Sequence, residues 1–271
     1  MFTILKREQL AETVFSMGVE APDIARRALA GQFVILRLDE TGERFPLTLC
    51  DWSPGEGWIR LVLQVVGRST RKLSLMREGD AILDLVGPLG RPAEICEGGH
   101  VACVGGGVGI AAIHPICRSL REAGNRVTSI IGARTADLLI LEDEMAAVSD
   151  SLVITTDDGS RGLEGRVTWA LEELLKQERV DMVIAIGPAI MMKFSCAVTR
   201  EFEVPTRVSL NSIMLDGTGM CGTCRCEVEG KTRFACVDGP EFDGHAVDWN
   251  LLLSRLDQYK EEEEIARSLP I

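Results

Sequence analysis

The hydrophobic pattern of this chain changes near residue 100, and this change limits the folds that it can adopt. Before that point, apolar runs of strand length are separated by turn residues, as in antiparallel β-structure. Strands are expected at residues 31–39, 44–52, 58–66 and 80–90. We therefore predict that residues 1–98 form a small antiparallel β-barrel domain.

After residue 100, strand-length apolar runs alternate with segments of helical periodicity. The expected strands are 101–107, 126–133, 151–157 and 181–187, and the expected helices are 109–123, 138–148, 164–177 and 189–200. Parallel strands that are joined by helices form an open, doubly wound sheet. Residues 99–208 are thus predicted to be an α/β domain, and residues 209–271 a small C-terminal lobe with a terminal helix.

Composition narrows the class of protein. The 271 residues carry a net charge of −12, with an acidic run at 261–264 that reads as a solvated helix face, and this charge disfavours binding to nucleic acid. The first residues show no signal segment, and no apolar run reaches the roughly 18 residues of a membrane span. Nine cysteines are an odd number, so we expect reduced thiols in a cytoplasmic protein that does not enter a membrane.

A glycine-rich turn follows the first strand of the predicted α/β domain. Its residues are Gly105, Gly106, Gly107, Val108 and Gly109. Such a turn lets a pyrophosphate approach the N–H groups at a helix start, but it can also serve only to pack a helix on a sheet. Two further loops, 156–162 and 186–192, follow strands whose carboxyl ends lie at the same sheet edge. Together the three loops favour a nucleotide site.

Two short motifs stand out in the barrel half. "RFPLT" (44–48) offers a guanidinium, a rigid turn and a hydroxyl, and "VGRST" (66–70) precedes a short helical stretch. Ser69 and Thr70 are good helix caps, and the helix start that they indicate is a second anion site. Taken alone, Arg44 reads as a surface charge and Ser69 as a plain cap, and these residues do not by themselves indicate a flavin site.

A cysteine motif near the C-terminus carries the most specific chemistry. Cys221, Cys224 and Cys236 match the plant-type [2Fe–2S] spacing from its second ligand onward, and Asp216 occupies the place of the first cysteine. Asp216 can thus replace that thiolate as an iron ligand. Two alternatives stay open: a zinc site of Cys221, Cys224, Cys226 and Cys236, or a cluster with Cys226 as fourth ligand and Asp216 as a turn residue.

Three segments give the chain a specific resemblance: "IGPAIMMK" (186–193), "SLNSIMLDGTGMCGTCR" (209–225) and "FACVDGPEFDGHAVDW" (234–249). With them the chain resembles the small, electron-transfer subunits of NADH-dependent reduced ferredoxin:NADP+ oxidoreductases, also called sulfide dehydrogenase beta subunits. These belong to the ferredoxin reductase superfamily and are related to the electron-transfer subunit of dihydroorotate dehydrogenase. The resemblance implies a flavin-binding barrel, a nicotinamide-nucleotide domain and a [2Fe–2S] lobe.

The same resemblance assigns residues to each cofactor. The flavin and ribityl of FAD would contact Arg44, Pro46, Leu47 and Thr48, and its pyrophosphate would lie on Gly67, Ser69 and Thr70. The nicotinamide nucleotide would lie along Gly105, Gly106, Gly107, Val108, Gly109, Asp157, Asp158, Gly159 and Gly187. The cluster ligands would be Asp216, Cys221, Cys224 and Cys236. Cys226 is a departure, because the family usually has an apolar residue there.

The expected function is electron transfer between NAD(H) and a partner. FAD exchanges a hydride with the nicotinamide and single electrons with the cluster, so no acid or base residue is expected to take part. NADP(H) is an alternative because Arg134 could face its extra phosphate, whereas Asp157 and Asp158 disfavour that charge. The partner implied is a larger flavoprotein subunit with [4Fe–4S] clusters, in a heterodimer. Two other functions stay open: a dihydroorotate dehydrogenase subunit, or a non-catalytic redox adaptor with a vestigial nucleotide site.

Overall fold

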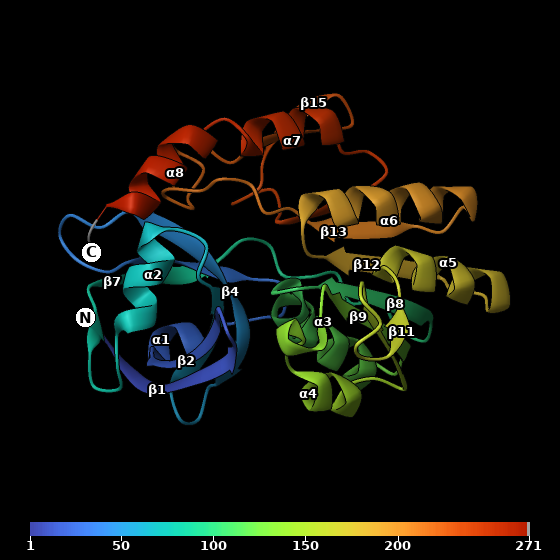
Figure 1. The fold of residues 1–271 in the computed structure, drawn as a ribbon, viewed down its shortest axis with the longest axis horizontal. Helices are drawn as coiled ribbons and strands as arrows, with labels where there is room; N and C mark the ends of the chain where they lie inside the picture. The colour runs from blue at the N-terminus through green and yellow to red at the C-terminus, as the bar shows by residue number, and fades with distance from the viewer. Residues whose placement is uncertain (270–271) are drawn as a thin grey trace.

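The N-terminal half folds into a nearly closed antiparallel barrel, as predicted (Figure 1). The computed structural model describes residues 1–269. The barrel strands lie in the order β6-β1-β2-β5-β4-β3-β7. Their bounds are β1 (Phe2–Ala11), β2 (Val14–Glu20), β3 (Phe33–Arg37), β4 (Arg44–Ser53), β5 (Trp58–Gln64), β6 (Ala81–Ile82) and β7 (Asp84–Leu89), with the helices α1 (Pro22–Ala25) and α2 (Arg68–Leu75).

The first two barrel strands escaped the sequence analysis. β1 is interrupted by charged side chains and pairs with β2 through two irregularities, between Ile4 and Lys6 and between Gln9 and Ala11. Each irregularity shifts the alternation of inward and outward side chains, so the apolar period of two is lost in the sequence.

The side chains of strand β5 alternate between the core of the barrel and the core of the α/β domain. Ile59, Leu61 and Leu63 are buried in the barrel core. Between them, Val62 is buried in the core of the α/β domain instead. Because neighbouring side chains point to opposite faces of a strand, β5 contributes to both cores at once.

The α/β domain has the doubly wound topology expected, with strand order β11-β10-β9-β8-β12-β13-β16. Helices cover both faces of this sheet (Figure 1). The bounds are β8 (His100–Gly106), α3 (Gly109–Glu122), β9 (Arg126–Ala133), η1 (Ala136–Leu138), α4 (Glu142–Ala147), β10 (Ser151–Thr156), β11 (Leu163–Glu164), α5 (Val167–Gln177), β12 (Met182–Ile186), α6 (Ala189–Glu201) and β13 (Thr206–Ser209). The chain runs outward from β8 in both directions, so the strand order reverses between β8 and β12.

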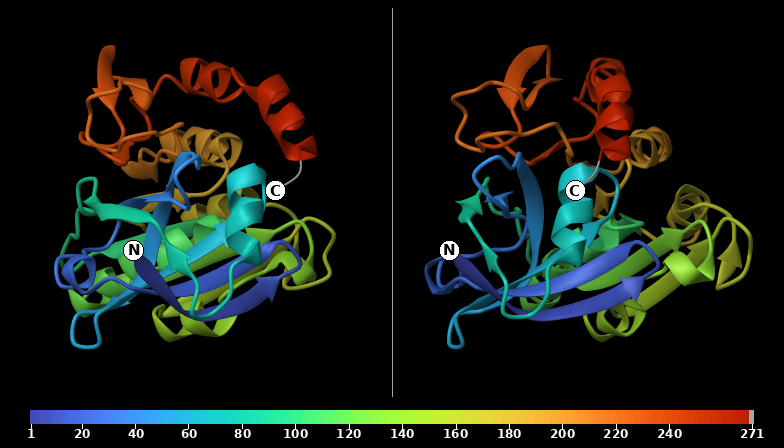
Figure 2. Two further views of the ribbon diagram at one scale, coloured as in Figure 1. Left: turned by 90° about the vertical axis from the view of Figure 1, so that its left-hand side faces the viewer. Right: turned by 60° about the vertical axis from the view of Figure 1, so that its left-hand side comes forward.

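The C-terminal lobe is tied to this sheet by its strand β16. The lobe consists of β14 (Arg225–Val228), β15 (Lys231–Phe234), β16 (Glu241–Asp243), α7 (Trp249–Leu256) and α8 (Lys260–Ser268). β16 pairs antiparallel with β13 and extends the sheet. Figures 1 and 2 show α7 beside α6 and α8 beside α2, so the C-terminal helices span from one domain to the other. Among residues 1–269, no helix has the length and hydrophobicity needed to cross a bilayer.

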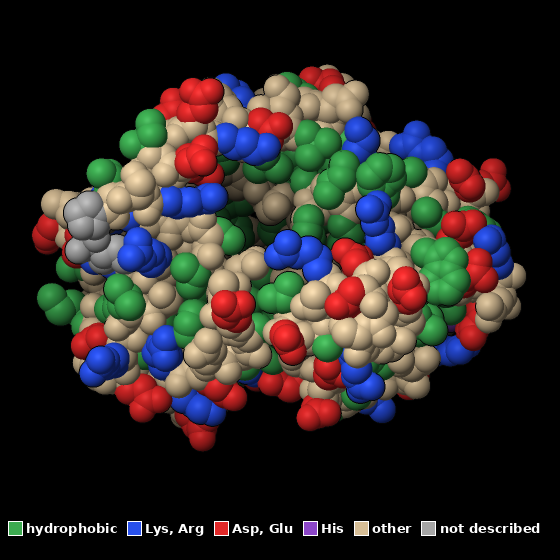
Figure 3. Space-filling model, in the orientation of Figure 1, with side chains coloured by type: hydrophobic (Ala, Val, Ile, Leu, Met, Phe, Trp, Pro, Cys, Tyr) green, Lys and Arg blue, Asp and Glu red, His purple; other side chains and the backbone are tan. Residues whose placement is uncertain are grey.

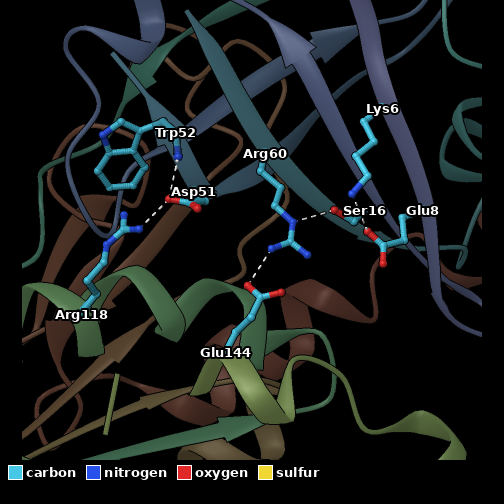
Figure 4. A network of polar contacts seen from close by, with 8 residues as sticks. All are labelled: Lys6, Glu8, Ser16, Asp51, Trp52, Arg60, Arg118 and Glu144. Atoms are coloured by element: carbon cyan, nitrogen blue, oxygen red, sulfur yellow. Dashed lines mark hydrogen bonds and ion pairs between the residues drawn. The ribbon is translucent and has the colours of Figure 1, made fainter. Parts of the chain in front are cut away.

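Polar contacts fix the barrel against the α/β domain (Figure 4). Arg118 of α3 donates to the Asp51 carboxylate of β4 at 2.6 Å, and its guanidinium lies 5.2 Å from the ring centre of Trp52. Arg60 of β5 donates to Glu144 of α4 at 2.7 Å. These charges are half-buried, which makes them stronger than exposed pairs.

We expect Arg118→Met to lower the free energy of unfolding by about 1–2 kcal/mol, because it leaves Asp51 without its charged donor. Urea unfolding of the purified protein measures this change. The matched control is Lys6→Met, whose ion pair with Glu8 is exposed, and it should change stability by less than about 0.5 kcal/mol. Equal effects of the two substitutions would show that this contact does not lock the domains.

Candidate functional site

The glycine-rich turn after β8 lies against the end of β12. A side-chain carbon at Gly109 would approach the carbonyl oxygen of Ile186 to 2.3 Å, so this glycine is required for packing. Gly107 differs: its φ is +55° and the space around it is open. The start of α3 is therefore pressed against the switch point of the sheet, where its free N–H groups can meet an anion.

A cavity of about 380 Å³, here called the strand-edge cavity, lies over the carboxyl ends of β8, β9 and β10. Of the predicted nucleotide residues, Gly106, Gly107, Val108 and Asp157 line it. Ile190 and Met191, from the predicted loop 186–192, also line it, together with two residues that the sequence analysis missed, Arg166 and Phe194. Arg166 precedes α5, so the cavity also reaches a second helix start.

Other predicted nucleotide residues lie beside this cavity rather than on its wall. The Asp158 carboxylate accepts hydrogen bonds from the hydroxyl and N–H of Ser160, and these bonds lower its pKa. Gly159 lies in the same turn, with a φ of +71°. Gly105 packs on Ile110 inside the domain. Their contact with a nucleotide stays a prediction.

A larger cavity of about 630 Å³, here called the interdomain cavity, lies between the barrel, α3 and residues 209–214. The predicted residues on its wall are Pro46, Leu47, Thr48, Thr70, Gly106, Gly107, Val108, Gly109 and Gly187. Figure 3 shows the molecule hollowed between the two domains and the C-terminal helices, with hydrophobic side chains inside the hollow and Lys and Arg on its rim.

The segment Ser209–Met214 was not predicted to belong to this cavity. Ser212 is 6% exposed, and its hydroxyl has no hydrogen-bond partner among the described residues. Buried hydroxyls are normally satisfied. An orphan hydroxyl on the wall of a large cavity therefore fits a site for a ligand with polar atoms.

The pyrophosphate motif needs a correction. α2 begins at Arg68, after Gly67, so Ser69 and Thr70 lie within its first turn and do not cap it from outside. The Thr70 hydroxyl accepts from the N–H of Gly67 at 3.0 Å, while the Ser69 hydroxyl donates to Glu43. Arg44, Gly67 and Ser69 are not on the cavity wall described above, and their role stays a prediction.

The two cavities share part of their wall. Five residues line both: Gln64, Gly106, Gly107, Val108 and Pro188. The two spaces therefore adjoin at these residues. A molecule in one cavity would meet a molecule in the other beside them.

The cysteine motif forms a loop with two adjacent thiols. The Sγ atoms of Cys224 and Cys236 are 3.2 Å apart, and the N–H of Cys236 points at Cys224 Sγ at 3.4 Å. Burial raises the pKa of Cys236 to about 12. Cys221 is exposed, and a hydrogen bond with Thr223 lowers the pKa of its thiol. Burial alone keeps such a thiol protonated, so it is the adjacency of the two sulfur atoms, and not the pKa, that indicates a site for a metal.

Asp216 closes the same loop. Its two carboxylate oxygens accept from the N–H groups of Thr218 and Cys221, each at 2.9 Å, and the bond from Thr218 contributes most to its lowered pKa. Each oxygen keeps a free lone pair, so ligation to iron is compatible with these bonds. At Gly217, with φ +73°, a side-chain carbon would approach Leu89 of β7 to 2.6 Å. The loop is therefore pressed against the barrel.

The Cys226 thiol contacts a backbone carbonyl group. It is buried on β14, its Sγ contacts the carbonyl oxygen of Arg233 at 3.6 Å, and burial raises its pKa to about 11. Within residues 1–269, no three His, Cys, Asp or Glu side chains converge on one ion-sized point. A zinc site needs four donors around one ion, whereas a [2Fe–2S] cluster takes two donors at each iron. The thiol pair fits the second arrangement.

Comparison with known proteins agrees with this geometry. Residues 211–248 match the model of the iron–sulfur cluster binding domain of dihydroorotate dehydrogenase B. A Thermotoga maritima homologue of the dihydroorotate dehydrogenase B (NAD(+)) electron transfer subunit is 54% identical, over 97% of this chain and 93% of its own length. The electron transfer subunit of Desulforamulus reducens is 33% identical, over 91% of this chain and 97% of its own.

The chain belongs to the family of dihydroorotate dehydrogenase B electron-transfer subunits and their homologues. A solved structure of an NADH-dependent reduced ferredoxin-NADP oxidoreductase, studied for flavin-based electron bifurcation, also matches it. That match has a TM-score of 0.94 and 53% identity and covers 98% of this chain and 96% of the other. The resemblance drawn from the sequence is thus confirmed. The chain is an electron-transfer subunit of an oxidoreductase, with FAD, a [2Fe–2S] cluster and NAD(H) as cofactors.

We expect Gly107→Val to weaken NADH binding at least tenfold, about 1.4 kcal/mol. The new side chain would project into the open space of the cavities from a backbone that disfavours it. Fluorescence titration with NADH measures the affinity. Gly98→Val is the matched control, since Gly98 has a φ of +69° and open surroundings but lies on neither cavity wall. Unchanged NADH binding in Gly107→Val would place the nucleotide site elsewhere.

Proposed function

We propose that this chain binds FAD in the interdomain cavity and NAD(H) in the strand-edge cavity, and that it passes single electrons to a [2Fe–2S] cluster held by Asp216, Cys221, Cys224 and Cys236. The shared wall at Gly106, Gly107 and Val108 carries the proposal, because hydride transfer requires direct contact between nicotinamide and flavin. FAD supplies the conversion of a hydride pair into single electrons.

Named residues of the chain would hold each of the three cofactors in position. The start of α3 offers N–H groups to a pyrophosphate, and Pro46, Leu47 and Thr48 form the barrel side of the interdomain cavity. Ser212 offers a hydroxyl to a polar edge of the flavin. Gly217 brings the cluster loop onto the barrel, which shortens the electron path from flavin to cluster.

Selection of NAD(H) over NADP(H) is assigned to Asp157. Its carboxylate is on the wall of the strand-edge cavity, where it can accept a hydrogen bond from a ribose hydroxyl and would repel a phosphate at the same position. Arg134 and Arg166, on the same wall, would balance the pyrophosphate charge that both dinucleotides carry.

The relatives are subunits of larger oxidoreductases, and a partner subunit is therefore part of the proposal. We assign the chain to the ferredoxin:NADP+ oxidoreductase type, with a larger flavin and [4Fe–4S] subunit in the cytoplasm, because that structure matches 98% of this chain with a TM-score of 0.94 and 53% identity. The Thermotoga maritima protein, at 54% identity, is described only as a homologue of the dihydroorotate dehydrogenase B subunit, and the Desulforamulus reducens subunit itself is 33% identical. Apolar side chains surround the exposed cluster loop: Leu215, Met220 and Val237. This surface is the proposed docking face for the partner.

Anaerobic addition of NADH should bleach the flavin absorbance of the purified protein. NADPH should require at least a tenfold higher concentration, because Asp157 disfavours its extra phosphate. Asp157→Asn, which removes the negative charge but keeps the side-chain size, should narrow that difference. If neither dinucleotide bleaches the flavin, the chain is a redox adaptor with a vestigial nucleotide site.

The cluster ligands are tested by three substitutions. Asp216→Cys should keep the cluster but shift its reduced-state EPR spectrum and midpoint potential, since a carboxylate is a harder donor than a thiolate. Asp216→Ala should make the cluster labile, and Cys226→Ser should leave it nearly unchanged. If instead Cys226→Ser destroys the cluster while Asp216→Ala is silent, the ligands are four cysteines. Zinc without iron after anaerobic purification would contradict both ligand sets.

A further inference from the structure

The cluster loop is held from outside by an arginine of α7. Arg255 Nη2 donates to the carbonyl oxygen of Thr223 at 3.0 Å, and its side chain is half-buried. Thr223 lies between the proposed ligands Cys221 and Cys224. The hydrogen bond therefore fixes the segment that carries two of the cluster thiols.

This guanidinium has no carboxylate partner. Among residues 1–269, Arg255 makes no ion pair, and its recorded hydrogen bond is to a neutral carbonyl. Two other half-buried arginines are paired, Arg118 with Asp51 and Arg60 with Glu144, whereas Arg7 donates only to the carbonyl oxygen of Ser74. An unpaired cation that is partly withdrawn from water is unfavourable, so a counter-charge is expected where it points.

The surroundings of Arg255 are the two proposed redox sites. A small cavity of about 10 Å³ is enclosed by Arg255, Thr223 and Ser212, among others. Ser212 also lines the interdomain cavity.

We infer that Arg255 is a positioning residue that supplies the counter-charge of the cluster and raises its midpoint potential. This inference rests on the ligand set proposed above. Three thiolates and one carboxylate leave a [2Fe–2S] centre negative in both oxidation states, and reduction adds one more negative charge. A fixed cation stabilises the more negative state more strongly. Half-burial reduces its screening by salt.

Arg255→Gln removes the charge together with the reach of the side chain to Thr223, and Arg255→Lys separates the two effects because it keeps a charged donor. The equilibrium constant for one-electron reduction of the cluster should fall about tenfold, equivalent to a midpoint lower by about 59 mV. Redox titration followed by EPR measures the potential of the holoprotein. Arg255→Lys keeps the charge and should stay close to wild type. Arg267→Gln is the matched control, since it removes an exposed charge from α8 of the same C-terminal arm.

An unchanged midpoint in Arg255→Gln, with iron content retained, overturns the inference and leaves the proposed function intact. If Arg255→Gln loses its iron, the lysine variant decides: retained iron supports a role for the charge, and equal loss shows a purely steric role and overturns it. A wild-type protein without a [2Fe–2S] signal would overturn the proposed ligand set and this inference with it.

Discussion

The site depends on the close contact between the ends of β8 and β12. At this point of the sheet the strand order reverses, and side chains larger than hydrogen at Gly106 or Gly109 would collide with Met191 or with the Ile186 carbonyl. Because both positions are glycine, the turn packs closely against β12 and lines both cavities. In the function proposed above, the dinucleotide and the flavin meet at this turn.

The iron–sulfur site lies in the C-terminal lobe, which has little hydrophobic core of its own. Its strand β16 extends the sheet of the α/β domain, and its buried residues Cys224, Cys236 and Phe242 belong to the same hydrophobic cluster as Phe33 and Ile35 of the barrel. The cluster loop is therefore positioned by both domains. The half-buried contacts between α3 and β4 keep those domains in one arrangement, which a fixed electron path requires.

Much of the architecture could be predicted because its signals are local. The switch from strand runs to alternating strands and helices defines two sheets, and the spacing before Cys221 singles out Asp216. Residues that reach a site only through tertiary contacts could not be predicted from local sequence patterns. Ser212 and its neighbours carry no periodic pattern and reach the interdomain cavity only because β16 folds the lobe back. Arg255 is remote from the cysteines in sequence, and only the packing of α7 brings it to Thr223.

The most direct measurement is a crystal structure of the anaerobically purified protein with its cofactors and NADH bound. The account predicts the flavin between β4 and α3, with the nicotinamide in direct contact with it beside Gly107 and Val108. A flavin outside the interdomain cavity, or protein atoms between flavin and nicotinamide, would contradict it.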